Sequence, residues 1–160
     1  RRSLRAAGLQ AEASHITGGL VACTGNKGCK WSSADTKGHA VAIGKFLDSR
    51  LTLDQPINIH LTGCPHSCAQ HYIGDIGLLG AKVKDASGDS VEGYHVVLGG
   101  GIAPEAGIGR QVFTGIPFSG IPPLLERILK AYLEHREPGE NFATFTRKRE
   151  IKTLQELFST

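Results

Sequence analysis

The spacing of hydrophobic side chains predicts several helices along the chain. Between residues 30 and 51 these side chains recur at intervals of three and four, the period of a helix with one buried face, which we place near 31–49. Pro122 and Pro123 begin a second pattern of this kind, which predicts a helix at 120–136. Shorter helical patterns predict further helices at 3–9, 141–146 and 150–158.

Alternating or continuously apolar runs between these helices predict strands. A turn-rich link at 85–89 joins two of the longer runs, which indicates a hairpin. Because strands alternate with helices, we expect an α/β (α+β) fold with a mixed sheet flanked by helices. The predicted strands lie at 18–22, 57–62, 73–84, 91–99 and 109–115.

Length and composition favour one folded domain. A chain of 160 residues can bury a sizeable core but is short for two domains, so we expect a single domain over 1–160. Within it we expect a poorly defined segment at 1–17 and a helical part at 120–160. The chain starts at Arg1 and has no methionine, so we expect it to be a piece of a longer protein.

Charge and hydropathy narrow the class of partner. A formal net charge of +3 is too small to indicate nucleic-acid binding, although it suits an acidic protein partner. No apolar stretch approaches the roughly 20 residues that a membrane-spanning helix needs. We therefore expect no nucleic-acid or membrane partner and a cytoplasmic location.

The four cysteines fall into two pairs, each just after a predicted strand. Five residues separate Cys23 from Cys29, and three separate Cys64 from Cys68. Two short loops of this kind can supply four thiolates to an iron-sulfur cluster. A structural zinc site is the second interpretation, although zinc pairs usually enclose two to four residues. Disulfides and inert buried thiols are further alternatives.

The sequence around the cysteines resembles the sirohaem and 4Fe-4S nitrite and sulfite reductase family. Residues 23–29, followed by Asp35-Thr36-Lys37-Gly38-His39-Ala40, resemble the first cluster motif of assimilatory nitrite reductases. Residues 62–71, followed by Ile73-Gly74-Asp75-Ile76-Gly77, resemble the second motif. Segments 93–101 and 139–142 are similar in kind and order, so the resemblance runs from about Gly19 onward.

The resemblance implies the cluster-binding C-terminal half of a ferredoxin-type nitrite reductase, which reduces nitrite to ammonia in six one-electron steps. Family members bind their 4Fe-4S cluster through all four motif cysteines, here Cys23, Cys29, Cys64 and Cys68. The last of these, Cys68, would also bridge to the sirohaem iron. Catalytic arginine and lysine side chains would lie mostly in the other half, so we assign none here.

Further cofactor contacts follow from the same resemblance. Sirohaem would rest on the loop that holds Gly63, Pro65 and His66 and on the loop at Gly99 and Gly100, with the cofactor loops at one end of the sheet. Two positions depart from the family pattern, because His66 replaces an asparagine and Asp35 a glutamate. His66 either donates a hydrogen bond to sulfur or faces solvent.

The expected partners are ferredoxin or a similar acidic electron donor, a small oxyanion, and the missing N-terminal half. We interpret the lysines near the first motif as part of the donor's docking face, against the alternative of a solvated helix surface. His60, His71 and His95 are interpreted as structural. The lysines are Lys27, Lys30, Lys37 and Lys45.

Nitrite is favoured over sulfite because Cys23-Thr24-Gly25-Asn26 and Asp35-Thr36-Lys37 resemble the nitrite branch. Sulfite reduction to sulfide remains the alternative within the family. Outside it, a non-catalytic zinc or iron-sulfur module and a haem-free ferredoxin-like carrier stay open. Metal identity and a sirohaem absorption band distinguish them.

Overall fold

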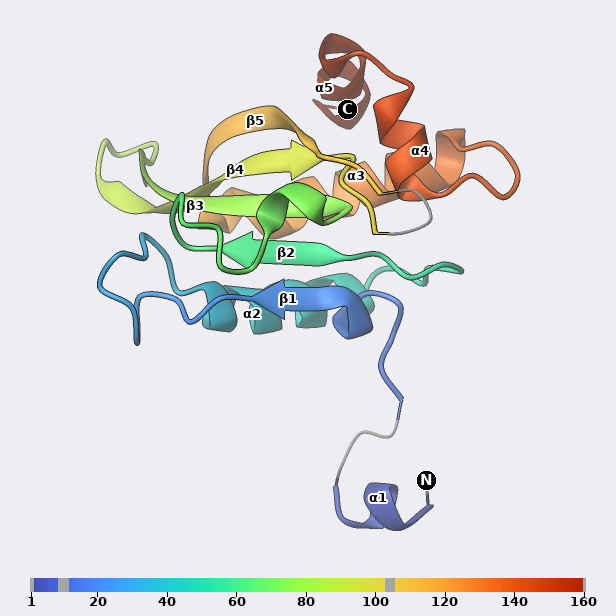
Figure 1. Cartoon of the computed structure of the whole chain (residues 1–160), viewed down its shortest axis with the longest axis horizontal. Helices are drawn as coiled ribbons and strands as arrows, with labels where there is room; N and C mark the ends of the chain where they lie inside the picture. The colour runs from blue at the N-terminus through green and yellow to red at the C-terminus, as the bar shows by residue number, and fades with distance from the viewer. Residues whose placement is uncertain (1, 9–11, 103–105, 160) are drawn as a thin grey trace.

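The computed structural model describes residues 2–8, 12–102 and 106–159. Its centre is a five-stranded sheet in the order β1-β2-β3-β4-β5 (Figure 1). The strands are β1 (Leu20–Ala22), β2 (Ile59–Thr62), β3 (Ile76–Lys84), β4 (Ser90–Leu98) and β5 (Arg110–Pro117).

The sheet is mixed, as the sequence predicts. The neighbours β1 and β2 are parallel, and β2 and β3 are parallel, whereas β3 to β4 and β4 to β5 are antiparallel. The predicted hairpin joins β3 to β4, with Asp85 Oδ1 accepting hydrogen bonds from the backbone N–H groups of Ser87 and Asp89, both at 2.9 Å. Because β1 and β2 run in the same direction, the loops that follow them leave the sheet at the same end (Figure 1).

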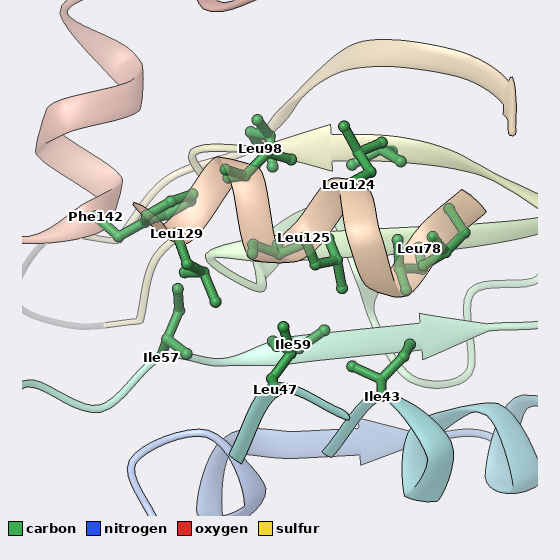
Figure 2. Packing of buried hydrophobic residues seen from close by; sticks show 14 of the residues in the cluster. Ile43, Leu47, Ile57, Ile59, Leu78, Leu98, Leu124, Leu125, Leu129 and Phe142 are labelled. Carbon is green, nitrogen blue, oxygen red and sulfur yellow. The ribbon is translucent and has the colours of Figure 1, made fainter. Parts of the chain in front are cut away.

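Helices cover one face of this sheet. Helix α2 (Thr36–Asp48) and helix α3 (Ile121–His135) lie behind it in Figure 1, and their apolar faces pack on the sheet. Figure 2 shows the resulting core, where Ile43 and Leu47 of α2 and Leu125 of α3 approach Ile59 and Leu78 of the sheet. All five of these side chains are fully buried.

The C-terminal part is helical, and it is tied to the sheet by polar contacts. Arg110 Nη2 on β5 donates to the backbone carbonyls of Thr146 and Arg149, each at 2.7 Å, which caps the end of α4. Gln155 Nε2 donates to Val112 O at 2.6 Å. The remaining helices are α1 (Arg2–Ala6), α4 (Phe142–Arg147), α5 (Ile151–Ser159) and the 3-10 turns η1 (Thr17–Gly19), η2 (His71–Ile73) and η3 (Phe118–Gly120).

Most predicted elements are confirmed, and the differences lie at their ends. The helix predicted from residue 31 begins only at Thr36, because Asp35 caps it by accepting from Gly38 N at 3.1 Å. The N-terminal helix ends at Ala6, and the predicted end at Leu9 lies outside the described residues. No helix in the described ranges is long and apolar enough to cross a membrane.

Candidate functional site

The first cysteine loop begins where β1 ends. Cys23 N donates to Leu61 O at 3.0 Å, which continues the parallel pairing of β1 with β2 by one residue. Gly25 has a φ of +74°, a conformation that favours glycine, and its carbonyl accepts from Cys29 N at 2.9 Å. The chain therefore turns back on itself, so that Cys29 follows Cys23 in one compact loop.

The second cysteine loop begins where β2 ends. Cys64 is buried, and its carbonyl accepts from Ser67 N at 3.1 Å, while Cys68 is exposed. Ser67 and Gln70 both have positive φ, at 58° and 51°, which is uncommon for residues other than glycine. A residue other than glycine in this left-handed conformation costs about 1–3 kcal/mol of folding free energy, and such residues concentrate at functional sites.

The two loops meet at Gly63. Gly63 N donates to Cys23 Sγ at 3.3 Å, and Gly63 O accepts from Ser33 N at 2.7 Å. A Cβ at Gly63 would lie 1.8 Å from Ser32 Oγ, and Ser32 N in turn donates to Cys29 O at 3.2 Å. Glycine is thus required where the second loop presses against the first, and the contact links Cys23 and Cys29 to the residue before Cys64.

Polar groups that suit thiolates lie beside the sulfurs. Thr36 Oγ1, at the first residue of α2, is 3.4 Å from Cys23 Sγ and donates to Cys23 O at 2.9 Å, so the N-terminus of this helix lies next to the first cysteine. His66 Nδ1 lies 3.5 Å from Cys64 Sγ. His66 is therefore both exposed and in contact with sulfur, and the sulfur that it reaches belongs to Cys64.

The four cysteines supply the thiol groups that an iron-sulfur cluster or a zinc ion would use as ligands. All four cysteines are free thiols, so the structure shows no disulfide among them. Within the described ranges, which include all four, no group of three or more His, Cys, Asp or Glu side chains is arranged to hold one metal ion. A cubane has a separate iron for each thiolate, so its ligands need not converge on one point.

Glu92 on β4 holds the first loop from the side, although nothing in the sequence indicates this role. Its carboxylate accepts from Asn26 Nδ2 at 2.5 Å and from Asp35 N at 2.8 Å, at the two sides of the Cys29 turn. Burial raises the pKa of Glu92, but these two hydrogen bonds, together with the charges of Lys82 and His39, lower it, and the net shift is downward. Glu92 is separated from Asn26 by 66 positions, so no local pattern could have found it.

Gly99 and Gly100 follow β4 at the level of the start of β3, away from the points where the two cysteine loops leave β1 and β2. The strand β4 is antiparallel to β3, so Leu98 pairs with Ile76 at the start of β3, whereas the cysteine loops lie toward its other end. Gly99 N donates to Asp75 O at 3.1 Å. A Cβ at Gly100 would lie 2.2 Å from Gly74 O, so packing within the chain explains this glycine.

The lysines divide into two groups. Lys27 pairs with Asp35 at 2.7 Å, and this hydrogen bond raises the pKa of Lys27 and lowers that of Asp35. Lys30 and Lys37 are exposed. Lys45 instead lies in the last turn of α2, about 13 Å along the helix axis from Thr36, beside Asp48. It does not belong to the face near the cysteines, which corrects that expectation.

The histidines interpreted as structural have hydrogen-bond partners within the fold. His60 Nδ1 lies 2.9 Å from Ala69 O, and His71 Nδ1 lies 2.8 Å from Ser67 Oγ. His95 Nδ1 accepts from Gly115 N at 3.2 Å. Two of these contacts hold the second cysteine loop in place, which gives His60 and His71 a supporting role.

Comparisons with known proteins agree with this site. A family model described as the nitrite and sulphite reductase 4Fe-4S domain matches residues 17–151. Relatives include sulfite reductase [ferredoxin] 2 of Mycolicibacterium paratuberculosis, 38% identical over 95% of this chain and 28% of its own length. Ferredoxin–nitrite reductase of Synechococcus elongatus is 40% identical over 71% of this chain and 22% of its own length.

A solved structure shares the fold at high similarity. The structure of the Mycobacterium tuberculosis NirA protein superposes with a TM-score of 0.86 and 36% identity. The superposition covers 96% of this chain and 29% of that one. The present chain thus spans less than a third of the length of these relatives.

Proposed function

Because this chain belongs to the nitrite and sulphite reductase 4Fe-4S domain family, we propose that it is the cluster- and sirohaem-carrying part of a ferredoxin-dependent reductase of a small oxyanion. The observation that carries the proposal is the contact of the two cysteine loops at Gly63. That contact brings thiol-bearing loops from two parallel strands to one end of the sheet.

The chain's own residues would hold and tune the cluster. Cys23, Cys29, Cys64 and Cys68 are the ligands in this proposal, with Cys68 bridging to the sirohaem iron. A bound cluster would supply single electrons to that iron, where the oxyanion is reduced. The Gly63 N–H donates to Cys23 Sγ at 3.3 Å and would stabilise its negative charge, while the Thr36 hydroxyl donates to Cys23 O at 2.9 Å and fixes the backbone of this cysteine.

The second cysteine loop is held in a shape that presents Cys68 to a ligand. Cys68 is exposed, while Ala69 behind it is buried and contacts His60 through its carbonyl. The left-handed Ser67 and Gln70 fix the backbone on either side. An exposed thiol on a constrained loop suits a ligand shared between two cofactors. Gly63, Pro65, His66, Gly99 and Gly100 stay as proposed sirohaem neighbours.

Nitrite is the substrate that we propose, because residues 23–26 and 35–37 resemble the nitrite branch. Sulfite is the second candidate, and one observation favours it: the sulfite reductase relative named above aligns over 95% of this chain, whereas the nitrite reductase named above aligns over 71%. The donor is proposed to be ferredoxin, and the location cytoplasmic.

The full-length enzyme tests the proposal directly. With reduced ferredoxin as donor, kcat/KM should be higher for nitrite, with ammonia as product, than for sulfite, with sulfide as product. A higher value for sulfite would transfer the assignment to the second candidate. Activity with neither oxyanion in a protein that holds iron and sirohaem would count against the proposed function.

A further inference from the structure

Trp31 is an aromatic side chain left in solvent next to the cysteine loops. It is the single tryptophan of the chain, and 64% of its surface is exposed. Tryptophan is enriched at the centres of protein interfaces, because its large ring buries much apolar surface with few rotatable bonds. An exposed tryptophan at a site built for electron transfer therefore suggests a partner.

The ring is held between charged and aromatic neighbours. Lys30 Nζ lies 5.0 Å from the ring centroid, within the range of a cation–π contact. The ring of His66 lies 6.4 Å away on the second loop. Trp31 thus touches side chains from both cysteine loops.

Position links this surface to two proposed cluster ligands. Trp31 lies two residues after Cys29, and His66 Nδ1 is 3.5 Å from Cys64 Sγ. A protein that buries the indole would be brought to the same end of the sheet as both sulfurs. Short separation between donor and acceptor is what electron transfer requires.

The charge around Trp31 identifies the chemistry of the partner. Lys30 has no carboxylate partner in the part of the chain that the structure describes, and the side chain of Lys27 is 77% exposed. The nearby carboxylates are balanced by other lysines, Asp35 by Lys27 at 2.7 Å and Glu92 by Lys82 at 3.7 Å, which leaves the charge of Lys30 uncompensated. The outward charge is therefore positive, which complements an acidic surface.

We propose that Trp31, flanked by Lys30 and His66, is the apolar anchor on which an acidic one-electron carrier protein docks. This inference rests on the proposed function and narrows it, because it assigns the donor's docking face to the end of the sheet with the cysteine loops. It excludes Lys45 from that face.

The test uses the full-length reductase and its Trp31→Ala, Trp31→Phe and Val41→Ala variants. Val41 is a matched control, since it is 57% exposed but lies on α2, outside the two cysteine loops. Turnover is measured with a reduced acidic ferredoxin and, separately, with a small viologen dye. Iron content is measured for every variant.

Trp31→Ala should raise the KM for ferredoxin about 30-fold, the size typical of a tryptophan hot spot. Turnover with the dye and iron content should stay at the wild-type level, Trp31→Phe should recover most of the effect, and Val41→Ala should behave as wild type. An unchanged ferredoxin KM in Trp31→Ala would overturn the docking inference alone. Equal losses with both donors would also overturn it, because Trp31 would then pack within the enzyme. Absence of iron from the wild-type protein would instead overturn the proposed function as well.

Discussion

At Gly63, one added methyl group should push the two cysteine loops apart. The Cβ of a Gly63→Ala variant would lie 1.8 Å from Ser32 Oγ and 2.8 Å from Ser32 Cβ, far inside van der Waals contact. Ser32 cannot yield alone, because its N–H is bonded to Cys29 O and its neighbour Ser33 donates to Gly63 O. A shift of Ser32 therefore moves the backbone of Cys29.

The expected cost is about 1–3 kcal/mol, the usual range for overpacking a well-filled site. Urea unfolding of the wild type and the variant measures this difference as a lower midpoint at an unchanged slope. Iron bound after anaerobic reconstitution should fall in the same variant, since the loops no longer meet in register. Gly120→Ala is the control, because a Cβ there meets only Ile116 Cγ2 at 3.3 Å.

A second substitution should rescue the first. Ser32→Gly removes both close atoms and leaves Ser32 Cα, at 3.4 Å, as the nearest neighbour of the new Cβ. The double variant should therefore be more stable than the sum of the two single effects predicts. If Gly63→Ala binds iron and unfolds as the wild type does, or if Ser32→Gly gives no rescue, the loops do not meet as described.

Two further predictions concern the support of the first loop and its pH dependence. Glu92→Ala removes the acceptor for Asn26 Nδ2 and Asp35 N, so it should lower the free energy of unfolding by about 1–3 kcal/mol in urea titrations. Glu92→Gln should give an intermediate loss. A Glu92→Ala variant as stable as the wild type would contradict the anchoring role. His39 stacks on Phe118 with the ring centroids 3.5 Å apart, and burial lowers its pKa below the ordinary 6.5. The unfolded chain therefore binds the His39 proton more readily than the folded chain does. Stability should be full above pH 6.5 and should fall as the pH drops from there through the lowered pKa of His39. Urea titrations at pH 7 and 5.5 should show a smaller fall in stability for His39→Gln than for the wild type.

The parts of the fold that follow from local chemistry were predictable. Apolar residues at intervals of three and four gave the helices at Ile121–His135 and Thr36–Asp48, and the Asp85 to Asp89 turn gave the hairpin. The positions of the two cysteine loops were also predictable, because each loop directly follows a short apolar run that forms a strand. The start of the helix at Thr36–Asp48 was less predictable, because the helical spacing of apolar residues already begins in the turn before its cap at Asp35.

Contacts between distant parts of the chain could not be predicted. The role of Glu92 depends on which strand lies beside the first loop, and the surroundings of Gly99 and Gly100 depend on the pairing of Leu98 with Ile76. The sequence predicts Gly63 as a cofactor neighbour but carries no signal for its packing against Ser32. A single sequence carries no direct signal for any of these contacts.

The central claim is that the four cysteines together hold a 4Fe-4S cluster, and anaerobic reconstitution of this chain with iron and sulfide tests it most directly. Iron, sulfide and zinc are measured for the wild type, for the Cys→Ser variants at 23, 29, 64 and 68, and for Ser87→Ala as a control in the distant hairpin turn. We expect about four irons per chain and a low-temperature EPR signal of the reduced cluster in the wild type and in Ser87→Ala. Each cysteine variant should lose that signal or most of its iron. One tightly bound zinc, with no EPR signal, would contradict the account.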